Sequence, residues 1–147
     1  MTDSAIGRTT GASRLAGARV LVVDDDPVVR EALCDILALY DADAYPFRTV
    51  AEGLEQARVS AATPDAVLLD LGVTDSQEAD PLAPWARACP GAVVVVMTGA
   101  DPEEVALRVG RARRWTFLAK PFGLEDLVET LAAALTAGRP ERPTRDA

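Results

Sequence analysis

Two kinds of hydrophobic pattern alternate along this sequence. The first is a short, unbroken apolar run rich in β-branched residues, which is typical of a strand buried on both faces of a parallel sheet. Such runs predict strands over residues 19–24, 66–70, 93–97 and 115–119. A weaker strand is predicted over residues 42–47, and Pro46 places it at the sheet edge because proline cannot donate a ladder hydrogen bond.

The second pattern is a recurrence of apolar residues at helical spacing, which predicts an amphipathic helix after each strand. The predicted helices cover residues 27–39, 49–59, 81–88, 101–112 and 124–135. Two of them have a strong start signal, Asp26-Pro27 and Asp101-Pro102, because aspartate is a good N-cap and proline suits the first helical position. Asp26 is therefore assigned to helix capping.

Five successive strand–helix units predict an α/β fold, a doubly wound five-stranded parallel sheet with helices on both faces. The 147 residues show no internal repeat and no second domain, and the folded domain is expected over residues 19–136. Residues 1–18 are rich in Thr, Ser, Gly and Ala and are expected to form a mobile arm. Residues 137–147 are rich in Pro and Arg and are expected to form a disordered tail.

Composition and charge exclude several classes of protein. The net charge of −8, from 23 acidic and 15 basic residues, argues against a general nucleic-acid binder, which needs a basic surface. The absence of histidine excludes a histidine ligand, base or phosphoryl acceptor. No apolar run reaches the roughly 18 residues of a membrane span, and residues 1–17 lack a signal-peptide core. Cys34 and Cys89 are interpreted as reduced, buried thiols, so we expect a cytoplasmic location.

Polar side chains follow four of the five predicted strands. Asp24 and Asp25 come after the first strand, Asp70 after the third, Thr98 after the fourth and Lys120 after the fifth. In a doubly wound sheet these strand ends meet in one crevice, which is where ligands bind. Because neighbouring carboxylates repel each other, a divalent cation is expected among them.

This combination of groups predicts a site for Mg²⁺ and a phosphoryl group, with Mn²⁺ as an alternative ion. Mg²⁺ takes hard oxygen ligands and keeps several waters, so a few carboxylates suffice. The ammonium of Lys120 suits phosphate oxygens, and the hydroxyl of Thr98 can bind another oxygen. Asp70 is then the nucleophile and forms an acyl phosphate.

Four segments of the chain resemble the motifs of a known family, the receiver domain of two-component response regulators. They are Val-Leu-Val-Val-Asp-Asp-Asp-Pro (20–27), Val-Leu-Leu-Asp-Leu (67–71), Val-Met-Thr-Gly (96–99) and Phe-Leu-Ala-Lys-Pro-Phe (117–122). Each motif is weak alone, whereas all four in this order, each at a strand end, are specific. The resemblance covers residues 19–135 and implies a flavodoxin-like sheet with strand order 2-1-3-4-5.

The resemblance also implies a phosphorylation site and its metal ligands. Asp70 accepts a phosphoryl group from a phosphohistidine on a sensor histidine kinase or a histidine phosphotransfer protein. Asp25 and Asp70 ligate Mg²⁺ directly, Asp24 acts mainly through water, and Gly72 contributes its backbone carbonyl.

A conformational switch is implied by the same resemblance. Lys120 bridges to the phosphoryl group, and its bond to Pro121 is cis. Thr98 moves toward a phosphoryl oxygen, and Phe117 follows inward as the switch aromatic.

The sequence departs from the family pattern after Asp70. Thr74 stands where the family usually has proline, and Glu78 where glycine is common, so an atypical loop and third helix are expected. Gly72 and Ala100 lack the polar side chains that help to orient the hydrolytic water in the family. We therefore predict slow self-dephosphorylation.

The leading interpretation is a stand-alone response regulator that is not an enzyme beyond its own phosphorylation and dephosphorylation. Its output is expected to go through an unknown protein partner rather than DNA, because no DNA-binding element follows the last helix. It is expected to be a monomer or a phosphorylation-dependent homodimer. An alternative is a degenerate receiver that acts as a phosphorylation-independent interaction module.

Two further alternatives concern other features of the chain. A phosphatase of the haloacid dehalogenase type also uses an aspartate nucleophile, but it needs a second aspartate two residues later, where this chain has Gly72. A basic, aromatic patch comprises Arg108, Arg111, Arg113, Arg114 and Trp115. This patch is either a solvated helix end, with cations favoured near the helix C-terminus, or a docking surface.

Overall fold

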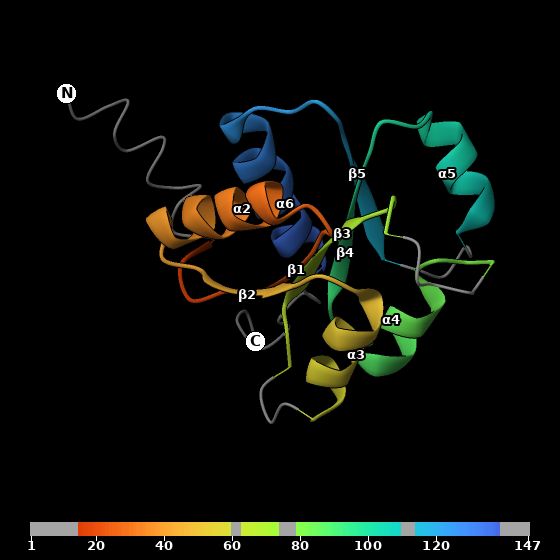
Figure 1. Cartoon of the computed structure of the whole chain (residues 1–147), viewed down its shortest axis with the longest axis horizontal. Helices are drawn as coiled ribbons and strands as arrows, with labels where there is room; N and C mark the ends of the chain where they lie inside the picture. Colours follow the sequence, from red (N-terminus) through yellow and green to blue (C-terminus); the bar gives the residue numbers. More distant parts are fainter. Residues whose placement is uncertain (1–14, 60–62, 74–78, 110–113, 139–147) are drawn as a thin grey trace, which may run out of the picture.

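The computed structural model describes residues 15–59, 63–73, 79–109 and 114–138, and its centre is a five-stranded parallel sheet (Figure 1). The strands are β1 (Arg19–Val23), β2 (Asp43–Phe47), β3 (Ala66–Asp70), β4 (Val93–Thr98) and β5 (Trp115–Ala119). Their spatial order is β2-β1-β3-β4-β5, with every neighbouring pair parallel. This confirms the predicted flavodoxin-like order.

Helices cover both faces of the sheet. They are α2 (Pro27–Leu39), α3 (Val50–Val59), α4 (Ala83–Ala88), α5 (Pro102–Arg108) and α6 (Leu124–Gly138). One core cluster joins α2 and α6 to residues such as Val20 and Val22 of β1. The other joins α3, α4 and α5 to Leu21 and Val23 of the same strand. Because side chains alternate along a strand, β1 contributes to both cores, as expected for a doubly wound sheet.

The burial of the strands follows their place in the sheet. All residues of β3 and β4 are buried, which is why these segments are continuous apolar runs. The edge strand β2 is mostly exposed and contains Pro46 opposite Val22. The prediction of an edge strand at this position is confirmed.

Local signals at the helix ends are also confirmed. The carboxylate of Asp26 accepts a hydrogen bond from the Val28 amide at 3.0 Å, and that of Asp101 accepts one from the Glu103 amide at 3.0 Å. Each bond satisfies an amide that has no partner within its own helix. The Lys120–Pro121 peptide bond is cis.

The predicted mobile arm of residues 1–18 is wrong for its last residues, which pack against the folded domain. Leu15 is fully buried in the core beneath α2 and α6, and Ala18 is buried beside it. The Gly17 amide donates to the Asp41 carbonyl at 2.8 Å, in a turn where Gly17 adopts a φ of 78° that favours glycine. An isolated leucine shows no periodicity, so its burial left no pattern in the sequence; residues 1–14 lie outside the described residues.

Five helix boundaries differ from those predicted, two of them by a single residue: α3 begins at Val50 rather than 49, and α5 at Pro102 rather than 101. Helix α5 ends at Arg108 rather than near 112, because Val109 adopts an extended conformation that buries its side chain. Helix α4 begins at Ala83 rather than Pro81. Helix α6 continues to Gly138, two residues into the predicted tail, and residues 139–147 lie outside the described part of the chain. Within the described residues, no helix is long and apolar enough to cross a membrane.

Candidate metal and phosphorylation site

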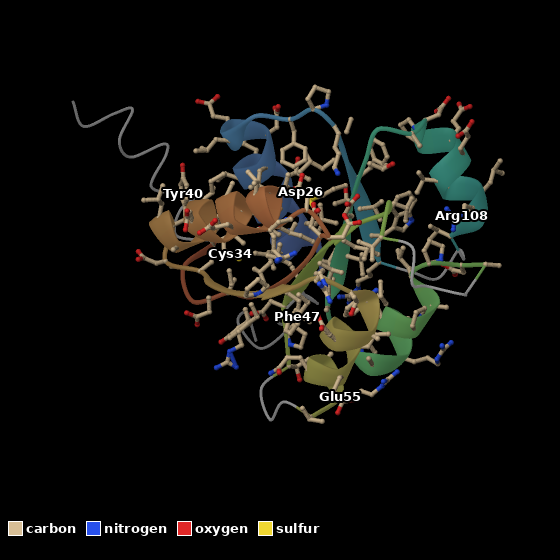
Figure 2. The ribbon with its side chains drawn as sticks, in the orientation of Figure 1. Asp26, Cys34, Tyr40, Phe47, Glu55 and Arg108 are labelled. Atoms are coloured by element: carbon tan, nitrogen blue, oxygen red, sulfur yellow. The ribbon has the colours of Figure 1, made fainter. Side chains whose placement is uncertain are left out.

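An acidic cluster lies at the carboxyl ends of β1 and β3. Asp24, Asp25 and Asp70 each offer one carboxylate oxygen, and these atoms lie within 4.8 Å of one another. Asp24 and Asp70 are buried, whereas Asp25 is exposed. Figure 2 shows Asp26 at the start of α2, beside this edge of the sheet. The parallel strands thus bring together carboxylates that are 45 to 46 positions apart in the sequence (70 − 25 and 70 − 24).

Asp24 has one carboxylate oxygen that the protein leaves unsatisfied. Its Oδ1 accepts a hydrogen bond from the Asp26 amide at 2.9 Å. Its Oδ2 is buried and has no hydrogen-bond partner among the described residues. Burial raises the pKa of Asp24, and Asp70 raises this pKa further, while the Asp26 amide and Lys120 oppose the shift. A buried anionic oxygen without a partner is costly. A cation bound to this oxygen, or a water molecule that is itself bound to a cation, would remove that cost.

The Asp70 carboxylate accepts hydrogen bonds from two donors. Its Oδ1 accepts hydrogen bonds from the Lys120 ammonium at 3.2 Å and from the Gly72 amide at 3.0 Å. The Lys120 amide in turn donates to the Thr98 carbonyl at 2.9 Å, which fixes the end of β5 beside β4. The predicted meeting of Asp70 and Lys120 is therefore present. The proposed ligand role of the Gly72 carbonyl stays a prediction.

The two predicted switch residues lie at different depths. Thr98 is buried at the end of β4, and its Oγ1 accepts a hydrogen bond from the Ala100 amide at 3.0 Å. Phe117 is half-buried and packs against the core formed with α3, α4 and α5. Phe117 pairs with Val96 in register, two residues before Thr98. Their movement on phosphorylation stays a prediction.

The residues of the acidic cluster fit Mg²⁺. All three side-chain ligands are carboxylate oxygens, which are hard donors, and one of the three residues, Asp24, also carries the unsatisfied Oδ2. Asp70 is already paired with the Lys120 ammonium. Asp25 is the exposed carboxylate of the three and is therefore the most accessible to an ion from solvent. No nitrogen or sulfur ligand that would favour zinc belongs to this cluster of described residues.

One contact at this site was missed by the sequence reasoning. The Nη1 of Arg30 donates a hydrogen bond to the backbone carbonyl of Asp24 at 2.8 Å. Periodicity placed Arg30 on the polar face of its helix, where a charged residue needs no special role. No sequence signal distinguishes an arginine that turns back onto a strand end from one that points into solvent.

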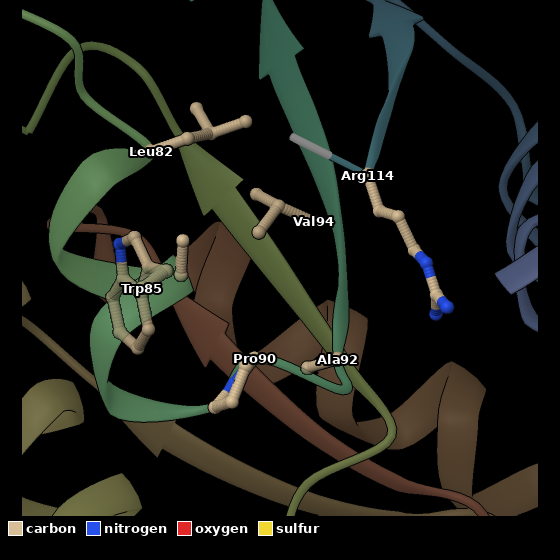
Figure 3. Close-up of a pocket in the computed structure, with 7 residues that line it drawn as sticks. Leu82, Trp85, Pro90, Ala92, Val94 and Arg114 are labelled. Atoms are coloured by element: carbon tan, nitrogen blue, oxygen red, sulfur yellow. The ribbon is translucent and has the colours of Figure 1, made fainter. Parts of the chain in front are cut away.

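The pocket in Figure 3 lies away from the acidic cluster. It has a volume of about 200 Å³ and is bordered by α4 and by the start of β4, with lining residues that include Leu82, Trp85, Val94 and Arg114. None of its described lining residues belongs to the acidic cluster. The chemistry of the chain is therefore assigned to the strand ends and not to this pocket.

The basic, aromatic patch is only partly described. Arg108 is exposed at the end of α5, well apart from Asp26 in Figure 2. Arg114 is also exposed, whereas Trp115 is half-buried and packs against the core. Arg111 and Arg113, like Thr74 and Glu78 of the atypical loop, lie outside the described residues. Trp115 therefore has a structural role, and docking by the arginines stays a prediction.

Comparison with known proteins identifies the family of this chain. The family model of the response regulator receiver domain matches residues 20–132. The chain belongs to this family. Receiver domains act in phosphorylation-based signalling, bind Mg²⁺ at an acidic pocket and are not conventional enzymes.

Several regulatory proteins are related to this receiver domain. It is 29% identical to the swarming motility regulation protein RssB of Serratia marcescens, over 78% of the chain and 51% of that protein. It is 31% identical to the probable transcriptional regulatory protein TcrX of Mycobacterium tuberculosis, over 79% of the chain and 49% of that protein. The chain thus spans about half the length of these relatives.

Solved structures share the fold. A CheY-like receiver domain from Methanospirillum hungatei has a TM-score of 0.74 at 23% identity, covering 84% of this chain and 97% of that one. The beryllofluoride-activated NtrC4 receiver domain dimer has a TM-score of 0.71 at 25% identity, covering 82% and 98%. In both comparisons, the match covers almost the whole of the solved receiver domain.

Proposed function

We propose that this receiver domain acts in the cytoplasm as the phosphoryl acceptor of a two-component signalling pathway. Asp70 takes a phosphoryl group from a phosphohistidine on a sensor histidine kinase or a histidine phosphotransfer protein, in a Mg²⁺-dependent reaction that the receiver itself catalyses. The observation that carries this proposal is the buried carboxylate of Asp70, held by Lys120 and lying within 4.8 Å of two further carboxylates.

Each residue of the site has a separate role in phosphoryl transfer. The bond between phosphorus and the donor imidazole nitrogen breaks while a bond forms to a carboxylate oxygen of Asp70, and the donor, protonated on its other ring nitrogen, leaves as neutral imidazole. Lys120 is placed to bind a phosphoryl oxygen, since its ammonium already lies 3.2 Å from Oδ1 of Asp70. Asp24, Asp25, Asp70 and the Gly72 carbonyl would hold Mg²⁺, which supplies positive charge against the phosphoryl oxygens.

Output follows from a shift between two conformations. In the unphosphorylated chain, the Thr98 hydroxyl is engaged by the Ala100 amide. A phosphoryl group on Asp70 offers a charged acceptor for the hydrogen of this hydroxyl, and Phe117 follows inward. A partner protein that prefers the second conformation then reads the signal. A protein partner suits the net charge of −8 better than DNA does.

Intact mass after incubation with acetyl phosphate tests the proposal. The wild type is expected to gain one phosphoryl group with Mg²⁺ and none with a chelator. Asp70→Asn is expected to gain nothing. Asp26→Asn is the matched control, because it removes a charge next to the site while asparagine keeps the N-cap; it is expected to be phosphorylated like the wild type.

A phosphorylated histidine kinase is the second donor in the same assay. A mass gain in Asp70→Asn, or in the wild type without divalent metal, contradicts the proposal. No gain from either donor favours the alternative of a phosphorylation-independent interaction module. The decay of the phosphorylated form in purified protein tests the predicted slow self-dephosphorylation, which a half-life of seconds would contradict.

A further inference from the structure

Arg30 reaches from α2 back onto the end of β1. Its Nη1 donates a hydrogen bond to the Asp24 carbonyl at 2.8 Å, and the side chain is half-buried in doing so. The Arg30 amide is separately used within the helix, donating to the Asp26 carbonyl at 2.9 Å. The guanidinium contact is therefore an additional tie between the helix and the strand end, formed by a charged donor, and such bonds are stronger than neutral ones.

This tie completes the restraint of Asp24. The Asp24 amide donates to the Phe47 carbonyl of β2 at 3.1 Å, and Oδ1 accepts from the Asp26 amide at 2.9 Å. With Arg30 on the carbonyl, Asp24 is held through its amide, its carbonyl and one carboxylate oxygen. The remaining oxygen, Oδ2, is the buried atom without a partner among the described residues. Its position is thus set by contacts from β2, from the turn after β1 and from α2.

We propose that Arg30 is a positioning residue for the acidic cluster, acting through the Asp24 carbonyl to hold the carboxylate in place for Mg²⁺. The inference rests on the Mg²⁺ site of the proposed function. Residues that orient the ligands of a metal site typically contribute 10–100-fold to metal affinity or activity. The Arg30 guanidinium bonds to the Asp24 backbone carbonyl rather than to a carboxylate of the cluster, so its role is positioning and not catalysis.

The sign of the effect separates positioning from simple electrostatics. A guanidinium near a cation site repels the cation, so a purely electrostatic role predicts that removing Arg30 tightens Mg²⁺ binding. A positioning role predicts the opposite, because the turn after β1 loses the bond that orients Asp24. The two interpretations therefore give changes of opposite direction in one measurement.

The test is calorimetric titration of the metal-free chain with Mg²⁺ for Arg30→Met, Arg30→Lys and a control. Methionine keeps the unbranched apolar stem and the helix propensity but removes the guanidinium. The control is Arg58→Met, which removes the same charge from an exposed position in the last turn of α3. Arg30→Met is expected to weaken Mg²⁺ binding by about tenfold, Arg30→Lys to bind Mg²⁺ more tightly than Arg30→Met, and Arg58→Met to match the wild type.

A second readout separates positioning from loss of structure. The rate of phosphorylation by acetyl phosphate, measured against Mg²⁺ concentration, is expected to reach the wild-type maximum in Arg30→Met but to require about tenfold more Mg²⁺. Circular dichroism should show the folded state without metal. Arg30→Lys keeps the test decisive if Arg30→Met fails to fold, because lysine retains a charged donor but not the guanidinium fork, and a several-fold loss of affinity is then expected.

The outcomes distinguish this inference from the proposed function. Unchanged or tighter Mg²⁺ binding by Arg30→Met, with wild-type binding intact, overturns the positioning role alone. An equal weakening in Arg58→Met also overturns it, since the effect would then not depend on the hydrogen bond between Arg30 and the Asp24 carbonyl. Failure of the wild type to bind Mg²⁺, or full binding by Asp25→Asn, instead overturns the Mg²⁺ site itself.

Discussion

In this receiver domain, burial affects the ionisation of single residues as much as neighbouring charges do. Asp24 is 1% exposed, and burial is the main cause of its raised pKa. The same carboxylate would be unremarkable on the surface, since surface acids are solvated. Ionised Asp24 is therefore expected to cost stability in the metal-free fold, a cost that a bound cation would offset.

Substitution of Asp24 should make this cost measurable. The pKa of Asp24 in the folded chain lies above its ordinary value of 3.8, so ionisation favours the unfolded chain as the pH rises through this range. Without Mg²⁺, Asp24→Asn is expected to raise the free energy of unfolding at pH 7 by about 1 kcal/mol and to lose this advantage near pH 4. Urea unfolding at both pH values checks this; an effect equal at both would show that ionisation is not the cause.

The two cysteines differ in burial and lie in different cores. Cys34 on α2 is half-buried, and Cys89 after α4 is buried on the opposite face of the sheet; both are free thiols. Burial raises the pKa of Cys89 to about 11, so its thiol stays protonated and unreactive at neutral pH. The prediction of a buried thiol is confirmed for Cys89, whereas Cys34 is only half-buried.

Thiol titration tests the burial of Cys89 directly. In Cys34→Ala, which leaves Cys89 as the only cysteine, a disulfide reagent at pH 8 is expected to modify almost nothing in the native state and one thiol in urea. The reason is that reaction needs the thiolate and access to it. Cys89→Ala is the partner control and should react measurably in the native state. Rapid native reaction of Cys89 would contradict its burial.

At the scale of elements, α3 and α4 are joined by a close contact. A Cβ atom placed on Gly53 of α3 would lie 2.9 Å from Cη2 of Trp85 and 3.2 Å from Cγ2 of Val23. The helix therefore approaches both the sheet and α4 at a position that only glycine fills without displacement. Trp85 is buried there and also borders the pocket of Figure 3 on α4.

Gly53→Ala should be destabilising although alanine is the better helix former. The gain in helix propensity is about 1 kcal/mol, but overpacking a core position costs about 1–3 kcal/mol. A net loss of about 1 kcal/mol is expected in urea unfolding. Gly91→Ala is the control, since no atom lies within 4 Å of its added Cβ. A stabilised Gly53→Ala would mean that α3 can shift away from Trp85.

At the scale of the whole molecule, the sheet order creates the site. Strands β1 and β3 are neighbours although α2, β2 and α3 separate them in the sequence, and β4 and β5 follow beside β3. This arrangement gathers Asp24, Asp25, Asp70 and Lys120 at one edge. Clustered carboxylates at that edge oppose folding in the absence of a cation, so metal binding and stability are linked.

Mg²⁺ is therefore expected to stabilise the folded chain. At about 100 times its dissociation constant, the ion should raise the free energy of unfolding by roughly 2.7 kcal/mol, seen as a higher melting temperature. Asp25→Asn is expected to lose most of this rise, because it removes the exposed ligand. Asp26→Asn should retain it. If Asp25→Asn showed the full rise in melting temperature, the assignment of the metal ligands would be wrong.

The sequence alone determined the order and type of the elements and most of the site. Four apolar strand runs that each end at a polar residue predicted the parallel sheet, and in such a sheet strand ends must converge. Asp24, Asp25, Asp70, Thr98 and Lys120 were predicted on this basis, and the acidic cluster and the Asp70–Lys120 contact are present in the structure.

Only the tertiary structure decided which groups are buried, paired or left unsatisfied. The burial of Leu15, the early end of α5 at Arg108 and the turn of Arg30 onto the Asp24 carbonyl depend on neighbours distant in sequence or on side-chain direction. Periodicity records which face of an element is apolar. It does not record which single atom a long polar side chain reaches, because that depends on the three-dimensional position of its partner.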